Sequence, residues 1–282
     1  MASSTRASAT RKRLLSNQAA TIGLAIVVLY IAVALSADYL PLRNPLQIVG
    51  SARMAGPSWS LPLGADTFGR DLLSRIVFGA QLSLRVAVVS VAAALVAGSV
   101  LGLMAGYAGG WIDQAIMRSM DVLFAFPAVL LALGIVAALG PSANNVIIAI
   151  AVVYTPIFAR VVRGPVLAIK EREFVEAARA LGARASRILA LHVLPNLLSV
   201  LIVQTSIALS WAVLTEASLS FLGLSAQPPA PSWGVMLNEG RQNLELAPHL
   251  AIFPGLAIML AVLGFNLLGD GLRDVLDPRL RR

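Results

Sequence analysis

Cysteine is absent from this chain of 282 residues, and charged residues make up only 13% of it. The missing thiols exclude disulfide bonds and thiolate metal sites. Lysine occurs only at Lys12 and Lys170, and neither belongs to the pattern G-x-x-x-x-G-K-[ST] with which a P-loop holds the phosphates of ATP. The patterns H-E-x-x-H and G-x-S-x-G are also missing, so the sequence offers no recognisable hydrolytic site.

Apolar residues are what the chain has in excess. They make up 58% of the sequence, and the mean hydropathy is +0.81. Soluble domains are about a quarter charged, so this composition indicates an integral membrane protein in a lipid bilayer. The net charge of +8 could indicate a nucleic-acid partner. We expect none, because the basic residues gather in one set of loops.

The distribution of apolar runs predicts an all-α protein with six transmembrane helices, since about 20 apolar residues cross a bilayer. We expect a polar tail at 1–18, a first span with an external segment at 19–81, a core of five spans at 82–270 and a polar tail at 271–282. Within the core, a charged loop at 170–196 and an external loop at 215–249 separate spans. The predicted spans are 19–37, 82–107, 122–139, 145–159, 197–214 and 250–268.

The first apolar run has a competing interpretation as a signal peptide. It follows a basic segment, and Ala34-Leu35-Ser36 resembles a cleavage site. The run is longer than a usual signal core, so we interpret it as a span.

The external segment ends in an amphipathic pattern. Leu72, Leu73, Ile76, Val77 and Ala80 share one face of a predicted helix, and the opposite face carries Arg70, Asp71, Ser74 and Arg75. This pattern is typical of a helix that lies at the membrane surface. It predicts either a plain interfacial anchor or a gate for substrate.

The second and third spans carry signals for helix packing. Ala94, Gly98, Gly102 and Gly106 recur every four residues, a spacing that lets a second helix approach closely in lipid. A short loop at 109–121 then leads to the third span, in which Pro127 should loosen the helix.

The charged segment 171–196 lies between the fourth and fifth spans. Phe174, Ala177, Ala178 and Leu181 mark one apolar face of a helix over 171–181. Gly182 follows, where a left-handed cap would end that helix. A second short helix over 185–193 then runs to Pro195, which can open the next span.

The spacing of several residues in this segment matches the motif of a known protein family. Glu176-Ala177-Ala178, then three residues, Gly182 and later Leu194-Pro195 resemble the EAA loop of bacterial ATP-binding-cassette importer permeases. That pattern reads EAA, three residues, G, nine residues, I-x-L-P, and His192 stands where the pattern has Ile. The sequence HVLPN at 192–196 resembles the same segment in the second membrane subunit of dipeptide and oligopeptide importers. The alternative is an ordinary amphipathic surface helix before a span.

The resemblance implies a type I importer permease fold and a set of partners. In that family the loop docks into a groove on an ATPase subunit. The implied partners are a homologous permease subunit, two cytosolic ATPase subunits or a fused ATPase, and an extracytoplasmic substrate-binding protein. ATP and magnesium would be bound by the ATPase subunits, so no cofactor is expected in this chain. The docking residues that the resemblance implies are Glu173, Glu176, Ala177, Ala178, Ala180, Leu181, Gly182, Arg184, His192, Leu194 and Pro195.

The basic residues predict the orientation. An excess of Lys and Arg marks the cytoplasmic side of a membrane protein. With six spans and an internal N-terminus, the inner segments hold Arg6, Arg11, Lys12, Arg13, Arg118, Arg160, Arg163, Lys170, Arg172, Arg179, Arg184, Arg187, Arg273, Arg279, Arg281 and Arg282. The outer segments hold Arg43, Arg53, Arg70, Arg75, Arg85 and Arg241. We therefore expect a bacterial inner-membrane protein with both termini and the EAA-like loop in the cytoplasm.

Polar residues of the fifth span and its end are candidates for lining a transport pathway: Ser199, Gln204, Ser206, Ser210 and Glu216. Hydrogen bonding between helices is the alternative role. The centres of the predicted spans carry no ionisable group of the kind that proton-coupled carriers use. The sequence therefore favours a non-catalytic pathway subunit that is driven by partner ATPases.

The expected cargo is a dipeptide or oligopeptide, because the motifs resemble that branch. Related permeases with the same motifs carry nickel complexes, glutathione or other small solutes. Rival classes are an ATPase-independent channel or secondary carrier, and a membrane-embedded enzyme.

Overall fold

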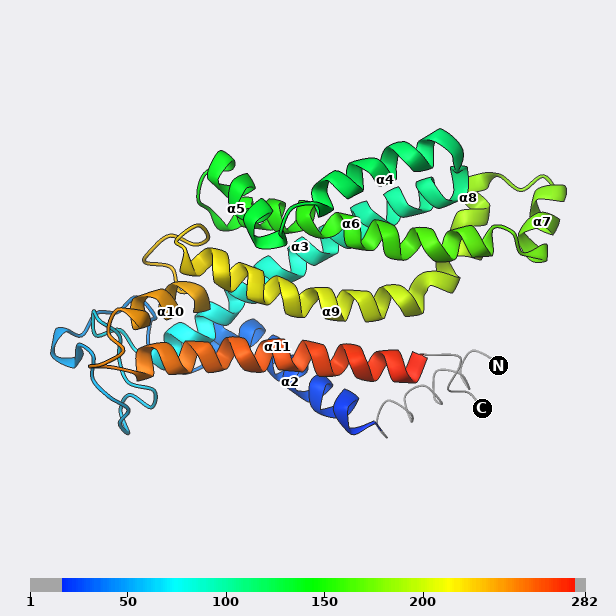
Figure 1. The fold of residues 1–282 in the computed structure, drawn as a ribbon. Coiled ribbons are helices and arrows are strands. Elements are labelled where there is room, and N and C mark those ends of the chain that lie inside the picture. Colours follow the sequence, from blue (N-terminus) through cyan, green and yellow to red (C-terminus); the bar gives the residue numbers. More distant parts are fainter. Residues whose placement is uncertain (1–16, 277–282) are drawn as a thin grey trace.

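The computed structural model describes residues 17–276, in which the regular structure is helical apart from one isolated bridge between Ala65 and Asp71 (Figure 1). The long helices are α2 (Gln18–Ser36), α3 (Leu72–Ala108), α6 (Ala143–Ile169), α9 (Leu194–Phe221) and α11 (His249–Leu276). Shorter helices are α4 (Gly110–Phe124), α5 (Ala128–Leu139), α7 (Glu173–Ala180), α8 (Ala185–Ile188) and α10 (Trp233–Arg241). Single turns are η1 (Ala37–Tyr39), η2 (Gly50–Ala52) and the π turn η3 (Leu189–Val193).

Five helices of the described residues are long and apolar enough to cross a membrane, and α4 with α5 makes a sixth if that bent pair is one span. The all-α membrane architecture predicted from composition is thereby confirmed. Most of the helices extend past the apolar runs. The fourth, fifth and sixth spans were predicted at 145–159, 197–214 and 250–268, and they continue for one or more turns as α6, α9 and α11.

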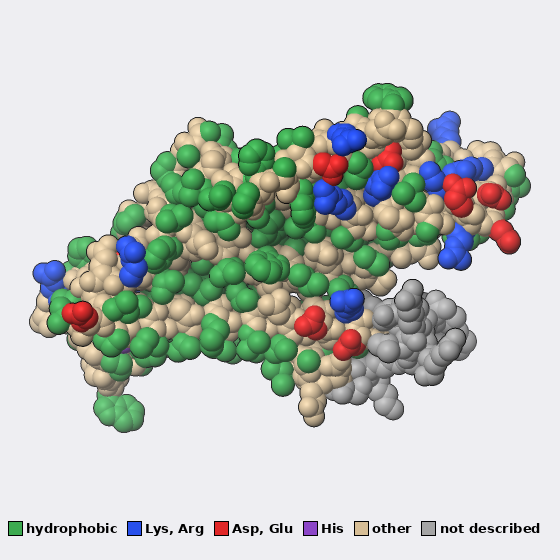
Figure 2. All heavy atoms as spheres, in the orientation of Figure 1, with side chains coloured by type: hydrophobic (Ala, Val, Ile, Leu, Met, Phe, Trp, Pro, Cys, Tyr) green, Lys and Arg blue, Asp and Glu red, His purple; other side chains and the backbone are tan. Residues whose placement is uncertain are grey.

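The helix bundle is elongated and has two ends (Figure 1). The start of α2 and the end of α11 meet where Asn17 Nδ2 donates to Asp274 Oδ2 at 3.2 Å, and α7 and α8 lie at the same end; we call it the α7 end. The segments 37–71 and 222–248, which include α10, lie at the opposite end, the α10 end. Between them the visible surface is largely hydrophobic, whereas Lys, Arg, Asp and Glu side chains gather towards the α7 end (Figure 2).

The most extensive helix contact joins α3 to α6, and the predicted glycine stripe makes it possible. A Cβ at Gly98 would lie 2.6 Å from the Thr155 carbonyl oxygen, and one at Gly102 would lie 2.5 Å from the Ala159 carbonyl oxygen. A Cβ at Gly106 would lie 2.8 Å from the Val166 side chain. Small residues therefore let the two backbones touch, as the four-residue spacing predicted.

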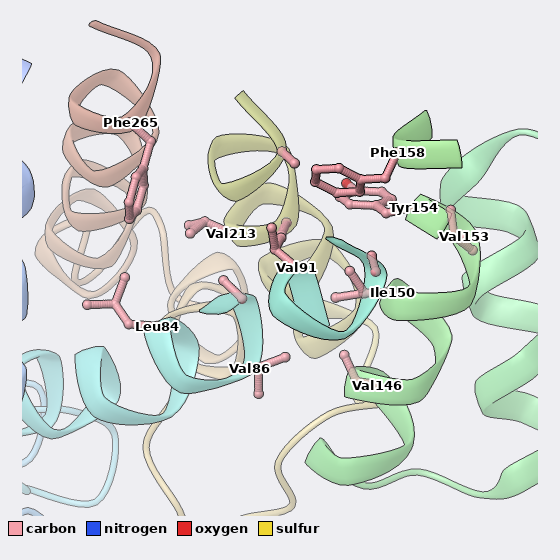
Figure 3. Packing of buried hydrophobic residues seen from close by; sticks show 14 of the residues in the cluster. Leu84, Val86, Val91, Val146, Ile150, Val153, Tyr154, Phe158, Val213 and Phe265 are labelled. Atoms are coloured by element: carbon pink, nitrogen blue, oxygen red, sulfur yellow. The ribbon is translucent and has the colours of Figure 1, made fainter. Parts of the chain in front are cut away.

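The buried core extends from this contact. Side chains of α3, α6, α9 and α11 form one hydrophobic cluster, in which Val86 and Val91 of α3 lie beside Val146 and Ile150 of α6 (Figure 3). Val146 and Ile150 lie one turn apart on the same face of α6, so this packing turns that face towards α3.

The first span packs along α11. A Cβ at Gly23 would lie 2.4 Å from the backbone nitrogen of Leu268, and the Tyr30 hydroxyl donates to the Ala257 carbonyl oxygen at 2.9 Å. The helix α2 is therefore part of the packed bundle. This packing favours a permanent span over the signal-peptide alternative.

The predicted interfacial helix is wrong as a separate element, because α3 runs unbroken from Leu72 to Ala108. Its supposed water-facing side is buried: Arg75 is 1% exposed. Asp66 Oδ2 lies 2.5 Å from Arg70 Nε and 3.3 Å from Arg75 Nε. Glu239 Oε2 of α10 lies 3.5 Å from Arg70 Nη2 and from Arg75 Nη2. These ion pairs bury the polar face against segments distant in sequence.

The third span, predicted at 122–139 with a helix loosened at Pro127, is broken into two helices, and the loop predicted at 109–121 is wrong. That loop is largely the helix α4, and the chain bends by 91° between α4 and α5. Pro127 explains the break, because it lacks an N–H and keeps the residue before it out of the helical region. Two ion pairs hold α4 against α6: Arg163 bonds Asp113 through two contacts of 2.6 Å, and Arg160 Nη2 lies 2.7 Å from Asp121 Oδ1.

The α3–α6 contact yields a stability prediction. Gly102→Ala places a methyl group against the Ala159 carbonyl oxygen, so the helices must separate and the free energy of unfolding should fall by about 1–3 kcal/mol. Gly134→Ala is the matched control, because nothing lies within 4 Å of a Cβ at Gly134. Thermal unfolding of the purified protein in detergent measures both. Equal unfolding temperatures for the two variants would contradict the close contact.

Candidate functional site

The segment at the α7 end is anchored to the bundle by a few buried side chains. Val175 of α7, Ile188 of α8 and Val193 of η3 are each 0% exposed and belong to the main hydrophobic cluster. The half-buried Ala178 and Ala183 pack against the same cluster. The loop is therefore a packed part of the bundle, and its remaining surface is presented outward.

A glycine-dependent cap ends α7. Gly182 has φ +79°, a conformation that costs other residues about 1–2 kcal/mol. The Ala183 N–H donates to the Ala178 carbonyl oxygen at 3.0 Å, and the Gly182 N–H donates to the Arg179 carbonyl oxygen at 2.9 Å. These two bonds define a Schellman motif. The left-handed cap predicted at Gly182 is confirmed.

The chain then enters the membrane without a break. The predicted short helix over 185–193 is α8 followed by the π turn η3, and it continues directly into α9, so that 185–221 forms one span. Pro195 lies in the first turn of α9 as predicted, but it does not separate two helices. The wider π turn before it accommodates the proline, and Asn196 Nδ2 donates to the His192 carbonyl oxygen at 2.7 Å.

The apolar face that periodicity predicted for α7 lies mostly on the outside of the protein. Val175 is the buried anchor, whereas Phe174 is 46% and Leu181 is 88% exposed. Ala177, which completes the spacing i, i+3, i+7, is also exposed. We call Phe174, Ala177 and Leu181 the apolar stripe. The apolar stripe lies at the α7 end, and its three residues are exposed in the part of the chain that the structure describes.

The structure brings most of the predicted docking residues to this one surface. The exposed ones are Glu173, Glu176, Ala177, Ala180, Leu181, Gly182, Arg184 and Pro195, and the half-buried ones are Ala178, His192 and Leu194.

Two ring contacts missed by the sequence analysis brace this surface. The Phe174 and His192 ring centroids are 6.1 Å apart, and the Arg179 guanidinium lies over the Tyr107 ring at 5.2 Å. They tie α7 to the π turn and to the end of α3. Only the aromatic character of Phe174 and Tyr107 could have suggested them.

The candidate pathway residues divide into two groups. Ser199 and Gln204 are half-buried on α9, and their pathway role stays a prediction. Ser206 and Ser210 are buried against α11: a Cβ at Gly269 would lie 3.3 Å from Ser206 Cβ, and Ser210 Oγ donates to Asn266 Oδ1 at 2.8 Å. Both serines therefore take part in helix packing, and their pathway role stays a prediction.

The Glu216 side chain of α9 is 0% exposed. It therefore lines no surface of this chain. Ser225 Oγ donates to Glu216 Oε1 at 3.3 Å, and the hydroxyls of Ser83 in α3 and Ser220 in α9 also face the carboxyl group. Ser220 Oγ lies 2.5 Å from Ser232 Oγ. We call these four serines and Glu216 the serine cage. It joins α3, α9 and the segment 222–232.

No three Asp, Glu or His side chains of residues 17–276 lie close enough together to hold a metal ion. The arrangement at the α7 end offers instead an exposed, rigidly held helix with apolar and acidic side chains. Such a helix can dock into a complementary groove on a partner.

The fold and this surface define a class: a multi-pass membrane protein with an exposed, capped helix at one polar end. Comparison with known protein families narrows that class. The family described as binding-protein-dependent transport system inner membrane component matches residues 98–282. The chain belongs to this family and is a non-catalytic permease subunit of an ATP-binding-cassette importer, which works with ATPase and substrate-binding components.

Similar proteins cover nearly the whole chain. The dipeptide transport system permease protein DppC of Alkalihalophilus pseudofirmus is 48% identical over 270 residues, which is 96% of this chain and 89% of that protein. The glutathione transport system permease protein GsiD of Pectobacterium atrosepticum is 48% identical over 271 residues, 96% of this chain and 90% of that protein. The GsiD of Escherichia coli O6:K15:H31 is 50% identical over 226 residues, 80% of this chain and 75% of that protein.

The serine cage yields a stability prediction. Glu216→Ala leaves buried hydroxyls without a partner and opens a cavity, so the free energy of unfolding should fall by about 2–4 kcal/mol. Glu216→Gln keeps the volume and an acceptor oxygen, and it should cost about 1 kcal/mol. Thermal unfolding measures both variants, with Glu245→Ala at an exposed site as the control. If Glu216→Ala and the control have the same unfolding temperature, the serine cage does not contribute to the stability of the fold.

Proposed function

We propose that this chain forms one half of the translocation pathway of a type I importer for dipeptides or oligopeptides. A homologous permease subunit would supply the other half. Two cytosolic ATPase subunits, or a fused ATPase, would bind ATP and magnesium and dock at the α7 end. An extracytoplasmic binding protein would deliver the cargo to the α10 end.

The observation that carries this proposal is the exposed apolar stripe. Leu181 and Phe174 leave large apolar surfaces in water, although their helix is rigidly capped and anchored. Burying an exposed leucine side chain is worth about 1.5–3 kcal/mol. Glu173 and Glu176 beside the stripe give a partner charges to recognise. A groove with an apolar floor and basic walls would complement this surface.

The substrate class follows from the relatives. The names of the similar proteins specify dipeptide or glutathione transport, and glutathione is itself a small peptide. A short peptide is therefore the cargo that both names support. Uptake of labelled dipeptide in competition with glutathione, in vesicles that contain the whole transporter, separates the two. A transporter that accepts neither would overturn the peptide assignment.

The orientation belongs to the same proposal. The α7 end carries the docking surface, so it should face the cytoplasm together with the start of α2 and the end of α11. The excess of basic residues in the same segments supports this orientation.

The stripe gives a direct docking prediction. Leu181→Asp places a charge in the proposed interface, so the ATPase subunits should no longer co-purify with the permease, and transport should be lost. Leu246→Asp is the matched control, because Leu246 is 81% exposed near the α10 end and should leave the complex intact. Correct insertion of both variants is checked by membrane fractionation. Retention of the ATPase by Leu181→Asp would exclude the stripe as the interface.

The orientation can be tested by chemical labelling, because the chain has no cysteine of its own. Ala180→Cys should react with a membrane-impermeant thiol reagent only when the cytoplasmic side is open to it. Leu246→Cys should react from outside in intact cells. The reverse pattern for this pair would overturn the proposed topology.

A further inference from the structure

Arg85 is an unpaired charge on a largely apolar helix face. It is exposed on α3, and Val88, Val89 and Val96 follow it on the same exposed face. No acidic side chain among residues 17–276 pairs with it, in contrast to Arg70 and Arg75 of the same region. An exposed arginine in such a setting needs an anion or water at its guanidinium.

The position of Arg85 along α3 indicates its depth in the membrane. The helix ends at Ala108, at the α7 end, and 108 − 85 = 23 residues separate the two positions. At 1.5 Å per residue this is ~34 Å, close to the hydrocarbon thickness of about 30 Å. With Ala108 at the bilayer surface of the α7 end, as the proposed orientation requires, Arg85 is placed near the lipid headgroups on the side of the α10 end.

A groove lies directly beside the guanidinium. It has a volume of about 490 Å³ and lies between α3 and the segments of the α10 end. Its other lining residues are Pro45, Leu46, Phe78, Gln81, Leu82, Ala230 and Pro231. The walls are mostly apolar, and the Gln81 amide group already donates to Asp38 at 3.2 Å. Arg85 is the only charged side chain in this lining.

We propose that Arg85 and this groove bind one phospholipid of the outer leaflet. The guanidinium holds the phosphate through paired N–H donors, and the apolar walls take the glycerol region and the first methylene groups. The lining favours a lipid over a peptide, because a zwitterionic peptide would also need a carboxylate for its ammonium group, and none lines the groove. The bound lipid would join α3 to the segments around Pro45 and Pro231.

Native mass spectrometry tests the proposal on the complete transporter. The complex is reconstituted in nanodiscs of phosphatidylethanolamine and phosphatidylglycerol, released, and its retained phospholipids are counted. The wild-type complex should retain one phospholipid that Arg85→Gln loses. Arg43→Gln is the matched control: it removes an exposed cation from the same side of the protein without touching the groove, and it should retain the lipid.

A second variant separates lipid binding from any damage to the fold. Ala230→Trp fills the groove and leaves the guanidinium in place, so it should lose the lipid while the unfolding temperature stays that of the wild type. Arg85→Lys keeps the charge without the fork of donors and should retain the lipid only in part.

Three results would overturn the proposal. Equal retention by wild type and Arg85→Gln would show that no lipid depends on this arginine. Displacement of the lipid by millimolar dipeptide would assign the groove to the cargo. A cross-link from position 85 to an acidic residue of the other permease subunit would show that Arg85 serves subunit contact instead. None of these results depends on the docking role of α7. The lipid site and the docking of the ATPase can therefore be refuted independently of each other.

Discussion

The direct backbone contact between α3 and α6 is the constraint on which the other features depend. Glycine at positions 98, 102 and 106 allows it, and lipid offers no hydrophobic driving force that could replace such close packing. The helix α6 positions α4 through two arginine–aspartate pairs and leads directly into α7. At the α7 end, Tyr107 of α3 contacts the Arg179 guanidinium. Near the α10 end, Ser83 of α3 belongs to the serine cage. Both polar ends are thus attached to the same pair of helices.

The sequence predicted what local chemistry determines. Apolar run lengths predicted five of the spans, the four-residue glycine spacing predicted the most extensive helix contact, and Gly182 predicted a cap that the Schellman bonds confirm. Of the residues that the EAA-like spacing indicated, eight are exposed and three are half-buried, and their docking role stays a prediction. Each of these signals is contained in a short stretch of chain, so no knowledge of distant partners was needed.

Features that depend on distant partners escaped prediction. Arg75 is buried because Glu239, 164 residues later, and Asp66 compensate its charge; the pattern alone suggested a water-facing side. Phe174 and Val175 are both apolar, and only the position of the bundle decides that Val175 is buried. Pro195 suggested a helix start, but the π turn before it lets the helix continue. The sequence suggested Glu216 as a pathway residue. The serines around its carboxyl group come from three separate segments, so the sequence did not reveal that they enclose it.

The unbroken helix behind the docking surface has a mechanical consequence. Beyond the π turn, α9 spans 28 residues, or ~42 Å at 1.5 Å per residue. A stiff rod of that length converts each degree of tilt at its base into a displacement of ~0.7 Å at its tip. The tip carries Glu216 within the serine cage, so the segment 222–232 must travel with it. A small rotation imposed at the base is therefore amplified at the far face of the membrane, and the π turn is the nearest point at which the rod can bend.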